Sequence, residues 1–259
     1  MLPHKHTKEG VLNEKLALKK LLTYMKSVYK IPQKIKCLTD ERKRKSIPLF
    51  NIVMPVLLFL MLQYESFHTI FSAPESMSKR LKNCISGRIP KVDAVRDLLS
   101  RINPDEIRSI HEEMIDIIKR NRVFREGTIG GYVVAGLDGV ELFSSTKKSC
   151  PNCLSRKKHT GETEYFYRSV VCMIIGKSPH VILGQEMLKP RDGSGKDEGE
   201  LTGGKRLIER LKKRHGHFAD VIVADALYLN APFINTLKEN GLEAVSYTHL
   251  RAHETGRNL

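Results

Sequence analysis

Residues 132–143 read Tyr-Val-Val-Ala-Gly-Leu-Asp-Gly-Val-Glu-Leu-Phe, and this stretch decides the fold class. It is rich in β-branched and aromatic residues, which predicts a buried β-strand. A second run, residues 220–228, reads Asp-Val-Ile-Val-Ala-Asp-Ala-Leu-Tyr and predicts another strand. Each run carries a central aspartate, Asp138 in the first and Asp225 in the second. Because an ionised carboxylate is costly in apolar surroundings unless it is paired or holds a metal ion, both aspartates are candidates for a functional site.

The segments between and after these two runs predict a mixed sheet with helices packed on it. Two further strand-like runs, two helical segments and a glycine C-cap complete the pattern: 166–175 and 180–188, about 198–213 and 232–240, and Gly241. The order is strand-strand-strand-helix-strand-helix. In such a sheet the fourth strand can pair beside the first, which would bring Asp138 and Asp225 together.

The first 125 residues have helical periodicity and predict an all-helical region. The expected helices lie at residues 11–30, 52–64, 76–86, 91–100 and from Asn103 to about Arg122. Asn103 followed by Pro104 is a strong helix start, with the asparagine as N-cap. The sequence therefore predicts an α+β protein, helical first and then built on a mixed sheet.

The charge of the chain favours a polyanionic partner. The 259 residues carry a net charge of +15, and residues 1–46 hold 13 Lys or Arg against 4 Asp or Glu. Such an excess favours nucleic acid, although a solvated basic arm is the alternative. The apolar run 47–62 is too short for a membrane span and is interrupted by two prolines. Five unevenly spaced cysteines do not suggest a disulfide framework, so a reducing cytoplasm is expected.

The residues alone leave the role of the two aspartates open. Mg²⁺ prefers hard oxygen ligands, and two carboxylates on neighbouring strands would suit a site for phosphodiester chemistry. Asp138-Gly139 would equally form a hairpin turn, and Asp225 would equally cap a helix after a strand.

Several stretches resemble DDE transposases of bacterial insertion sequences, in the IS4-like group. They are Gly-Leu-Asp-Gly-Val-Glu-Leu-Phe-Ser-Ser at 136–145, Cys-Pro-Asn-Cys at 150–153, Asp-Glu-Gly-Glu-Leu at 197–201 and Val-Ile-Val-Ala-Asp-Ala-Leu-Tyr-Leu-Asn-Ala-Pro-Phe at 221–233. The resemblance implies an RNase H-like core that uses Mg²⁺ (or Mn²⁺), with Asp138 and Asp225 as the first two catalytic acids and as metal ligands. It also implies cutting and joining at transposon ends.

The same resemblance implies partners and a place in the cell. The partners are transposon-end DNA and target DNA, with several copies of the chain assembling on DNA and no membrane involved. The location is the bacterial cytoplasm, in association with the nucleoid. Two alternatives stay open: an RNase H-like nuclease without strand transfer, and a DNA-binding fragment without catalysis.

The third acid of the family, usually a Glu on a later helix, has no match in this sequence. Residues 246–259 have neither strand alternation nor a clear helical face and look like a non-native tail, so we expect a truncated and impaired transposase. Glu200 is the best substitute, although a carboxylate at a helix start also suits the helix dipole. The expected division is a basic arm (1–46), a helical DNA-binding region (47–126), a truncated catalytic domain (127–245) and the tail.

Two further sequence patterns each allow more than one interpretation. Cys150 and Cys153 have the spacing of a zinc knuckle, but a structural zinc site needs four ligands. The histidines His159, His215 and His217 would have to complete it, and a redox pair or a simple turn are the alternatives. The segment 205–214 holds six Lys or Arg and would either follow a DNA backbone or form a solvated helix face.

Overall fold

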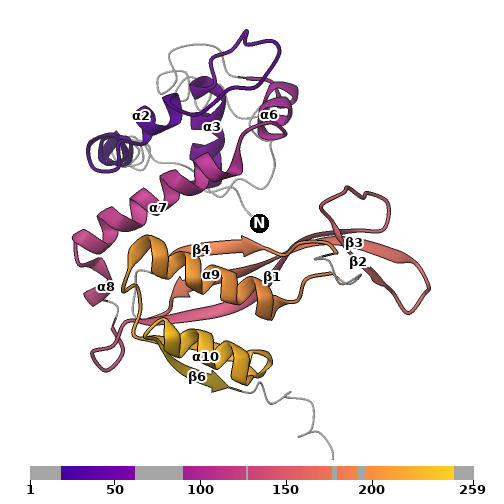
Figure 1. Cartoon of the computed structure of the whole chain (residues 1–259). Coiled ribbons are helices and arrows are strands. Elements are labelled where there is room, and N and C mark those ends of the chain that lie inside the picture. The colour runs from indigo at the N-terminus through magenta and orange to yellow at the C-terminus, as the bar shows by residue number, and fades with distance from the viewer. Residues whose placement is uncertain (1–18, 62–89, 127, 177–179, 192–196, 248–259) are drawn as a thin grey trace, which may run out of the picture. The chain divides into compact units, whose positions relative to one another are not determined.

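The computed structural model describes residues 19–61, 90–126, 128–176, 180–191 and 197–247 (Figure 1). The chain divides into two compact units, Met1–Met114 and Ile115–Leu259. Within the described ranges, no helix combines the length and the apolar character needed to cross a bilayer.

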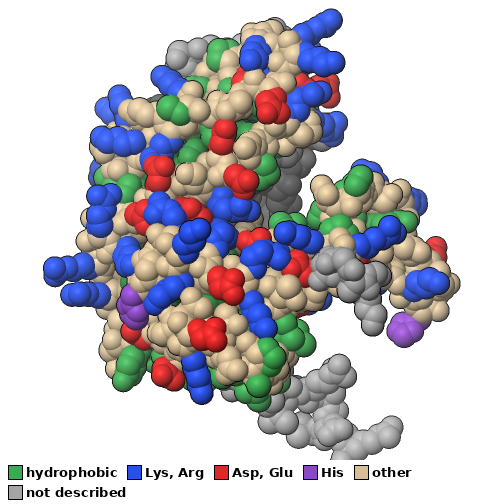
Figure 2. Space-filling view, viewed as in Figure 1, with side chains coloured by type: hydrophobic (Ala, Val, Ile, Leu, Met, Phe, Trp, Pro, Cys, Tyr) green, Lys and Arg blue, Asp and Glu red, His purple; other side chains and the backbone are tan. Residues whose placement is uncertain are grey.

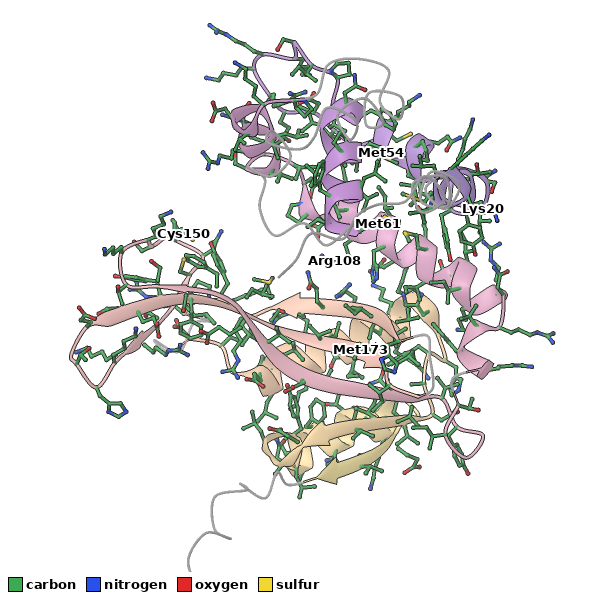
Figure 3. The ribbon with its side chains drawn as sticks, turned by 180° about the vertical axis from the view of Figure 1, so that it is seen from behind. Lys20, Met54, Met61, Arg108, Cys150 and Met173 are labelled. Atoms are coloured by element: carbon green, nitrogen blue, oxygen red, sulfur yellow. The ribbon has the colours of Figure 1, made fainter. Side chains whose placement is uncertain are left out.

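In its described parts the first unit contains helices and connecting loops and no strand, as predicted. Residues 19–27 are helical, and the further helices are α2 (Ile31–Lys36), α3 (Phe50–Met61), α6 (Val92–Leu99) and the greater part of α7 (Pro104–Arg120). The core of the unit is formed around α3, which carries Met54 and the almost fully buried Ile52 and Leu58 (Figure 3). The helix expected at 76–86 and the first 18 residues of the basic arm lie outside the described residues.

The predicted start of α7 is confirmed in atomic detail. The side-chain oxygen of Asn103 accepts a hydrogen bond from the backbone N–H of Asp105 at 2.9 Å. This bond satisfies one of the N–H groups that the first turn of a helix leaves unpaired. The local sequence therefore sets where this helix begins.

The second unit contains a six-stranded mixed sheet. Its strands are β1 (Val134–Ser145), β2 (Leu154–Lys157), β3 (Thr163–Ile174), β4 (Val181–Met187), β5 (Val221–Asp225) and β6 (Glu243–Tyr247). The order is β2-β3-β1-β5-β6, with β4 also paired to β3. Strand β1 runs antiparallel to β3 and parallel to β5, and β5 runs parallel to β6. The short β2, which lacks an apolar run, was not predicted.

Helices cover this sheet and complete its core. They are α9 (Glu200–His215), α10 (Ala231–Glu239), the short α8 (Val123–Glu126) and a single 3₁₀ turn η1 (Ala226–Tyr228). Helix α9 buries Leu207, Ile208 and Leu211 against the sheet. Because Gly204 has no side chain, α9 also approaches Tyr228 and Phe233 closely. The chain therefore has the predicted α+β class, with a mixed sheet and flanking helices after a helical first part.

Candidate active site

The two aspartates lie at adjacent positions on two neighbouring parallel strands, β1 and β5. The parallel register of β1 and β5 pairs Leu137 with Ala224, and Asp138 and Asp225 are the next residues on each strand. Parallel strands present successive residues side by side, so the two carboxylates emerge at adjacent positions. The prediction that the strand of Asp225 pairs beside the strand of Asp138 is confirmed.

The surroundings of the aspartates are more polar than the sequence suggested. The expectation that both lie buried within apolar strands is wrong, because Asp138 is exposed and Asp225 is half-buried. Asp225 stands at the last residue of β5, and in β1 the apolar burial ends at Leu137. The cost of burying a charge therefore gives no reason for a metal at either position, and the case for the site rests on geometry.

Strand pairing and local hydrogen bonds show whether Asp138 forms a hairpin turn and whether Asp225 caps a helix, the two alternatives that the sequence left open. Asp138-Gly139 is not a hairpin turn, since both residues lie within β1 and pair with β3. One oxygen of Asp138 accepts from the Gly139 N–H at 2.8 Å. Asp225 does act as a cap, because its side chain accepts from the Leu227 N–H at 3.0 Å at the start of η1. This cap holds the Asp225 carboxylate beside the end of β5.

A third carboxylate, from Glu200, reaches strand β1 beside Asp138. Glu200 is the first residue of α9, and its Cδ lies only 2.3 Å from the point where a Cβ on residue 139 would be. The glycine at 139 therefore leaves the space that this carboxylate occupies, directly beside Asp138. Arg168 of β3 forms an ion pair with Glu200, and the Tyr228 hydroxyl donates to Glu200 Oε2 at 3.2 Å.

Tyr228 is the hydrogen-bond donor to Glu200 in this site. Its ring is almost fully buried, and burial raises the pKa of its hydroxyl. The charge of Glu200 and the hydrogen bond to it raise that pKa further, and the charges of Asp138 and Asp225 add to the effect. The phenol therefore stays protonated and remains a donor to Glu200 at any ordinary pH.

Sequence reasoning kept Glu200 only as a substitute ligand. Its place in the sequence does not predict a contact with β1, because three strands separate β1 from α9 along the chain. The signal that would have found it is the glycine at 139, in the interior of strand β1 and directly after Asp138. A glycine within a strand often marks the close approach of another group.

The donor set suits a hard divalent cation. Carboxylate oxygens are the ligands of Mg²⁺ and Mn²⁺, and Mg²⁺ is commonly held by one or two carboxylates together with water and substrate phosphate. Asp138 and Asp225 meet that requirement. Among the residues that the structure describes, no three His, Cys, Asp or Glu side chains are grouped closely enough to hold an ion by themselves.

The two cysteines form a separate cluster at the projecting end of the sheet, on the connection from β1 to β2 (Figure 3). The sulfur of Cys150 lies 3.1 Å from that of Cys153 and 2.6 Å from the Tyr167 hydroxyl. His215 and His217 bond to Asp116 and Asp220 instead. Zinc binding by Cys150 and Cys153 therefore stays a prediction, without these two histidines as ligands.

Several basic residues of α9 have acidic partners in the fold. Arg206 pairs with Glu186 and Glu198, and Arg210 pairs with Glu186 on β4. These two guanidinium groups hold α9 against the edge strand β4. The basic segment 205–214 is therefore neither a continuous DNA-tracking face nor a wholly solvated one.

Comparison with known proteins gives one distant structural likeness. No protein-family model matches the chain, and no curated protein does. Among solved structures, the chain is similar to the piggyBac transposase in a cryo-EM structure of its synaptic complex with hairpin DNA, with a TM-score of 0.40 and 11% identity. The match covers 92% of this chain and 52% of that one, so this chain spans about half the length of the transposase. A likeness of this degree carries no argument about function.

Proposed function

We propose that the chain is a DNA-cutting and DNA-joining enzyme, a DDE transposase of the IS4-like group of bacterial insertion sequences. The observation that carries this proposal is the placement of Asp138 and Asp225 at adjacent positions on parallel strands, with the Glu200 carboxylate against Gly139. The sequence stretches that resemble such transposases surround these same residues.

In the proposed reaction Asp138 and Asp225 would hold Mg²⁺ or Mn²⁺ beside the scissile phosphate. A bound divalent ion would supply positive charge that stabilises the attacking and leaving oxygens of the phosphate. Water attacks the phosphate at the transposon end and the 3′-oxygen leaves as a hydroxyl. This freed 3′-hydroxyl then attacks a phosphate of target DNA, and the 3′-oxygen of the broken target strand leaves. Arg168 and Tyr228 hold the third carboxylate, Glu200, in place beside β1.

Metal binding tests the site before any reaction is assayed. We expect the chain to bind Mn²⁺, measured by the loss of the free-ion signal in electron paramagnetic resonance, and we expect Asp138→Asn and Asp225→Asn each to weaken that binding at least tenfold. Asp93→Asn is the matched control, because the Asp93 side chain is 93% exposed and lies in the helical unit. Equal Mn²⁺ affinity in all four proteins would refute the assignment of the two aspartates.

The reaction class is tested with DNA that carries a transposon end. Joined product in the presence of Mg²⁺ supports transposition, and nicking without joining supports a nuclease on the same fold. Binding alone, with no metal-dependent cutting by the chain or by a longer version of it, would contradict both enzymatic assignments.

A further inference from the structure

A cationic surface lies at the end of α9 opposite to Glu200. Two adjoining hollows of about 720 and 320 Å³ share Lys119 and Arg120 in their lining. Figure 2 shows Lys and Arg side chains gathered over α8 and the neighbouring end of α7. We call this surface the basic trough and define it by Lys119, Arg120, Arg122, Arg125 and Arg214. Except for Lys119, which is half-buried, these side chains are exposed.

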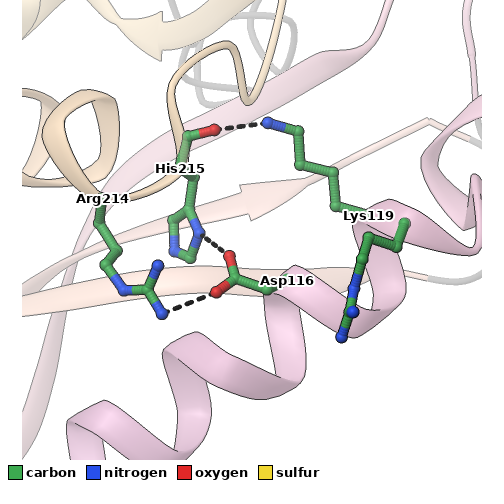
Figure 4. Close-up of a pocket in the computed structure, with 5 residues that line it drawn as sticks. Asp116, Lys119, Arg214 and His215 are labelled. Atoms are coloured by element: carbon green, nitrogen blue, oxygen red, sulfur yellow. Dashed lines mark hydrogen bonds and ion pairs between the residues drawn. The ribbon is translucent and has the colours of Figure 1, made fainter.

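The trough is held in shape by bonds between α7 and α9 (Figure 4). Asp116, the acid that lines it, accepts from His215 Nδ1 at 2.8 Å and pairs with Arg214 at 2.7 Å. Burial alone would raise the pKa of Asp116, but the bonds from His215 and Arg214 outweigh it and lower that pKa. Lys119 donates to the backbone carbonyl of His215 at the end of α9. Because Asp116 is ionised and already paired, the remaining cations give the trough a clear positive excess.

Arg122 occupies its place at a conformational cost. Its φ is +59°, in the left-handed region that favours glycine and is unfavourable for a long side chain. Strained backbone conformations of this kind concentrate where a side chain has a functional task. The residue at this position lines the smaller hollow, beside Arg125 and Lys119. An arginine rather than a glycine here is explained if its charge is used.

We propose that the basic trough binds the phosphate backbone of duplex DNA. Arginine and lysine fix a protein on DNA through phosphate contacts, which carry no sequence information themselves. The inference deepens the proposed function and rests on it for one point, the position of the trough relative to the cut. Helix α9 runs from Glu200, beside Asp138, to His215 in the lining of the larger hollow. Its 16 residues span roughly 22 Å at about 1.5 Å per residue.

That distance predicts where on the DNA the trough acts. At about 3.4 Å per base pair, roughly 22 Å corresponds to about six base pairs of duplex. The trough would therefore contact phosphates about six base pairs from the phosphate that lies at Asp138 and Asp225. Such a second contact fixes the direction in which the duplex crosses the sheet, which the two aspartates alone leave undefined.

The test uses Arg122→Gly, because this change removes the charge and also relieves the backbone. We expect the melting temperature of the whole chain to be kept, since glycine is favoured at positive φ. We expect its affinity for a labelled 30-base-pair duplex, measured by fluorescence anisotropy without divalent metal, to fall about three- to tenfold. The slope of log affinity against log salt should become shallower by about one, as for the loss of one phosphate contact.

Two further variants make the result specific. Arg125→Gln should act in the same direction as Arg122→Gly. Lys238→Gln removes a charge from an exposed position on α10 and should leave affinity and salt slope unchanged. Unchanged DNA affinity in Arg122→Gly and Arg125→Gln would overturn the inference, as would a wild-type chain that does not bind duplex DNA. Tighter, trough-dependent binding of an RNA of equal length would reassign the surface to RNA and overturn it as well.

The test of the basic trough can succeed or fail independently of the test of the metal site. The anisotropy assay needs neither metal nor catalysis. Trough-dependent duplex binding by a chain that fails to bind Mn²⁺ would leave the trough assigned and refute the metal site. A hydroxyl-radical footprint that lacks protection about six base pairs from the cut, in a chain that does cut, would refute the placement of the trough.

Discussion

Replacement of Arg206 by methionine should destabilise the sheet unit by about 3 kcal/mol. Glu198 is buried just before α9, with its side chain only 1% exposed, and Arg206 forms an ion pair with it. The same guanidinium contacts Glu186 and donates to the Met187 carbonyl at 3.0 Å. In Arg206→Met the Glu198 charge stays buried and loses this cation. Breaking a buried pair costs about 3 to 5 kcal/mol, and we take the lower end because Arg206 is 30% exposed.

The melting temperature measures this loss. For a chain of this size 1 kcal/mol corresponds to about 2 to 4 °C, so we expect a fall of roughly 6 to 12 °C. The control is Lys213→Met, which removes one charge from an exposed position of the same helix and should change the melting temperature by no more than about 2 °C. Both are read by differential scanning calorimetry near pH 7.

A second substitution tests the cause. Glu198→Gln in the Arg206→Met background removes the buried charge and keeps an oxygen for the Lys189 N–H, which donates to Glu198 at 2.8 Å. We expect it to restore at least half of the lost stability. If Arg206→Met lowers the free energy of unfolding by less than about 1 kcal/mol, or if Glu198→Gln does not rescue it, a buried unpaired charge is not the cause.

Two further results are expected. The pKa of Asp116 is lowered in the folded state, so its ionic bonds stabilise the fold above the ordinary value of 3.8 and cease to do so as the pH falls through the lowered pKa. Urea unfolding should therefore show Asp116→Asn less stable than wild type at pH 7 and equally stable near pH 2, and a pH-independent difference would contradict this. The hydrogen bonds from Tyr167 and Cys153 lower the pKa of the Cys150 thiol, whereas burial raises that of Cys172 to about 12. Iodoacetamide at pH 7.5 should label Cys150 well before Cys172, as read by peptide mass spectrometry, and Tyr167→Phe should slow the labelling of Cys150.

The elements that could be predicted are those whose signals are local. The start of α7 follows from Asn103 and Pro104, and the strand of Asp225 follows from its β-branched run. The pairing of that strand with the strand of Asp138 also followed, because the order of elements leaves few ways to build a mixed sheet. Strand β2 was missed, since Leu154–Lys157 has one buried residue and is held by pairing with β3.

Only part of the candidate site could be predicted from the sequence. Asp138 and Asp225 were placed correctly relative to one another, but their exposure was not, because burial depends on where the covering helices end. The approach of Glu200 to Gly139, and the pairing of Arg206 and Arg210 with acids near or on β4, are long-range contacts. Helical periodicity predicts that α9 exists, but not which charges it meets across the sheet.

The glycine at 139 also links two distant positions of the chain. Even a methyl group there would overlap the Glu200 carboxylate and displace it from its place beside β1. If that place matters to function, a working relative with alanine or a larger residue at the first position should tend to carry a shorter acid, such as aspartate, at the second. Covariation between these two columns, in chains that keep both aspartates, would record the reach from α9 to β1 as a constraint on evolution.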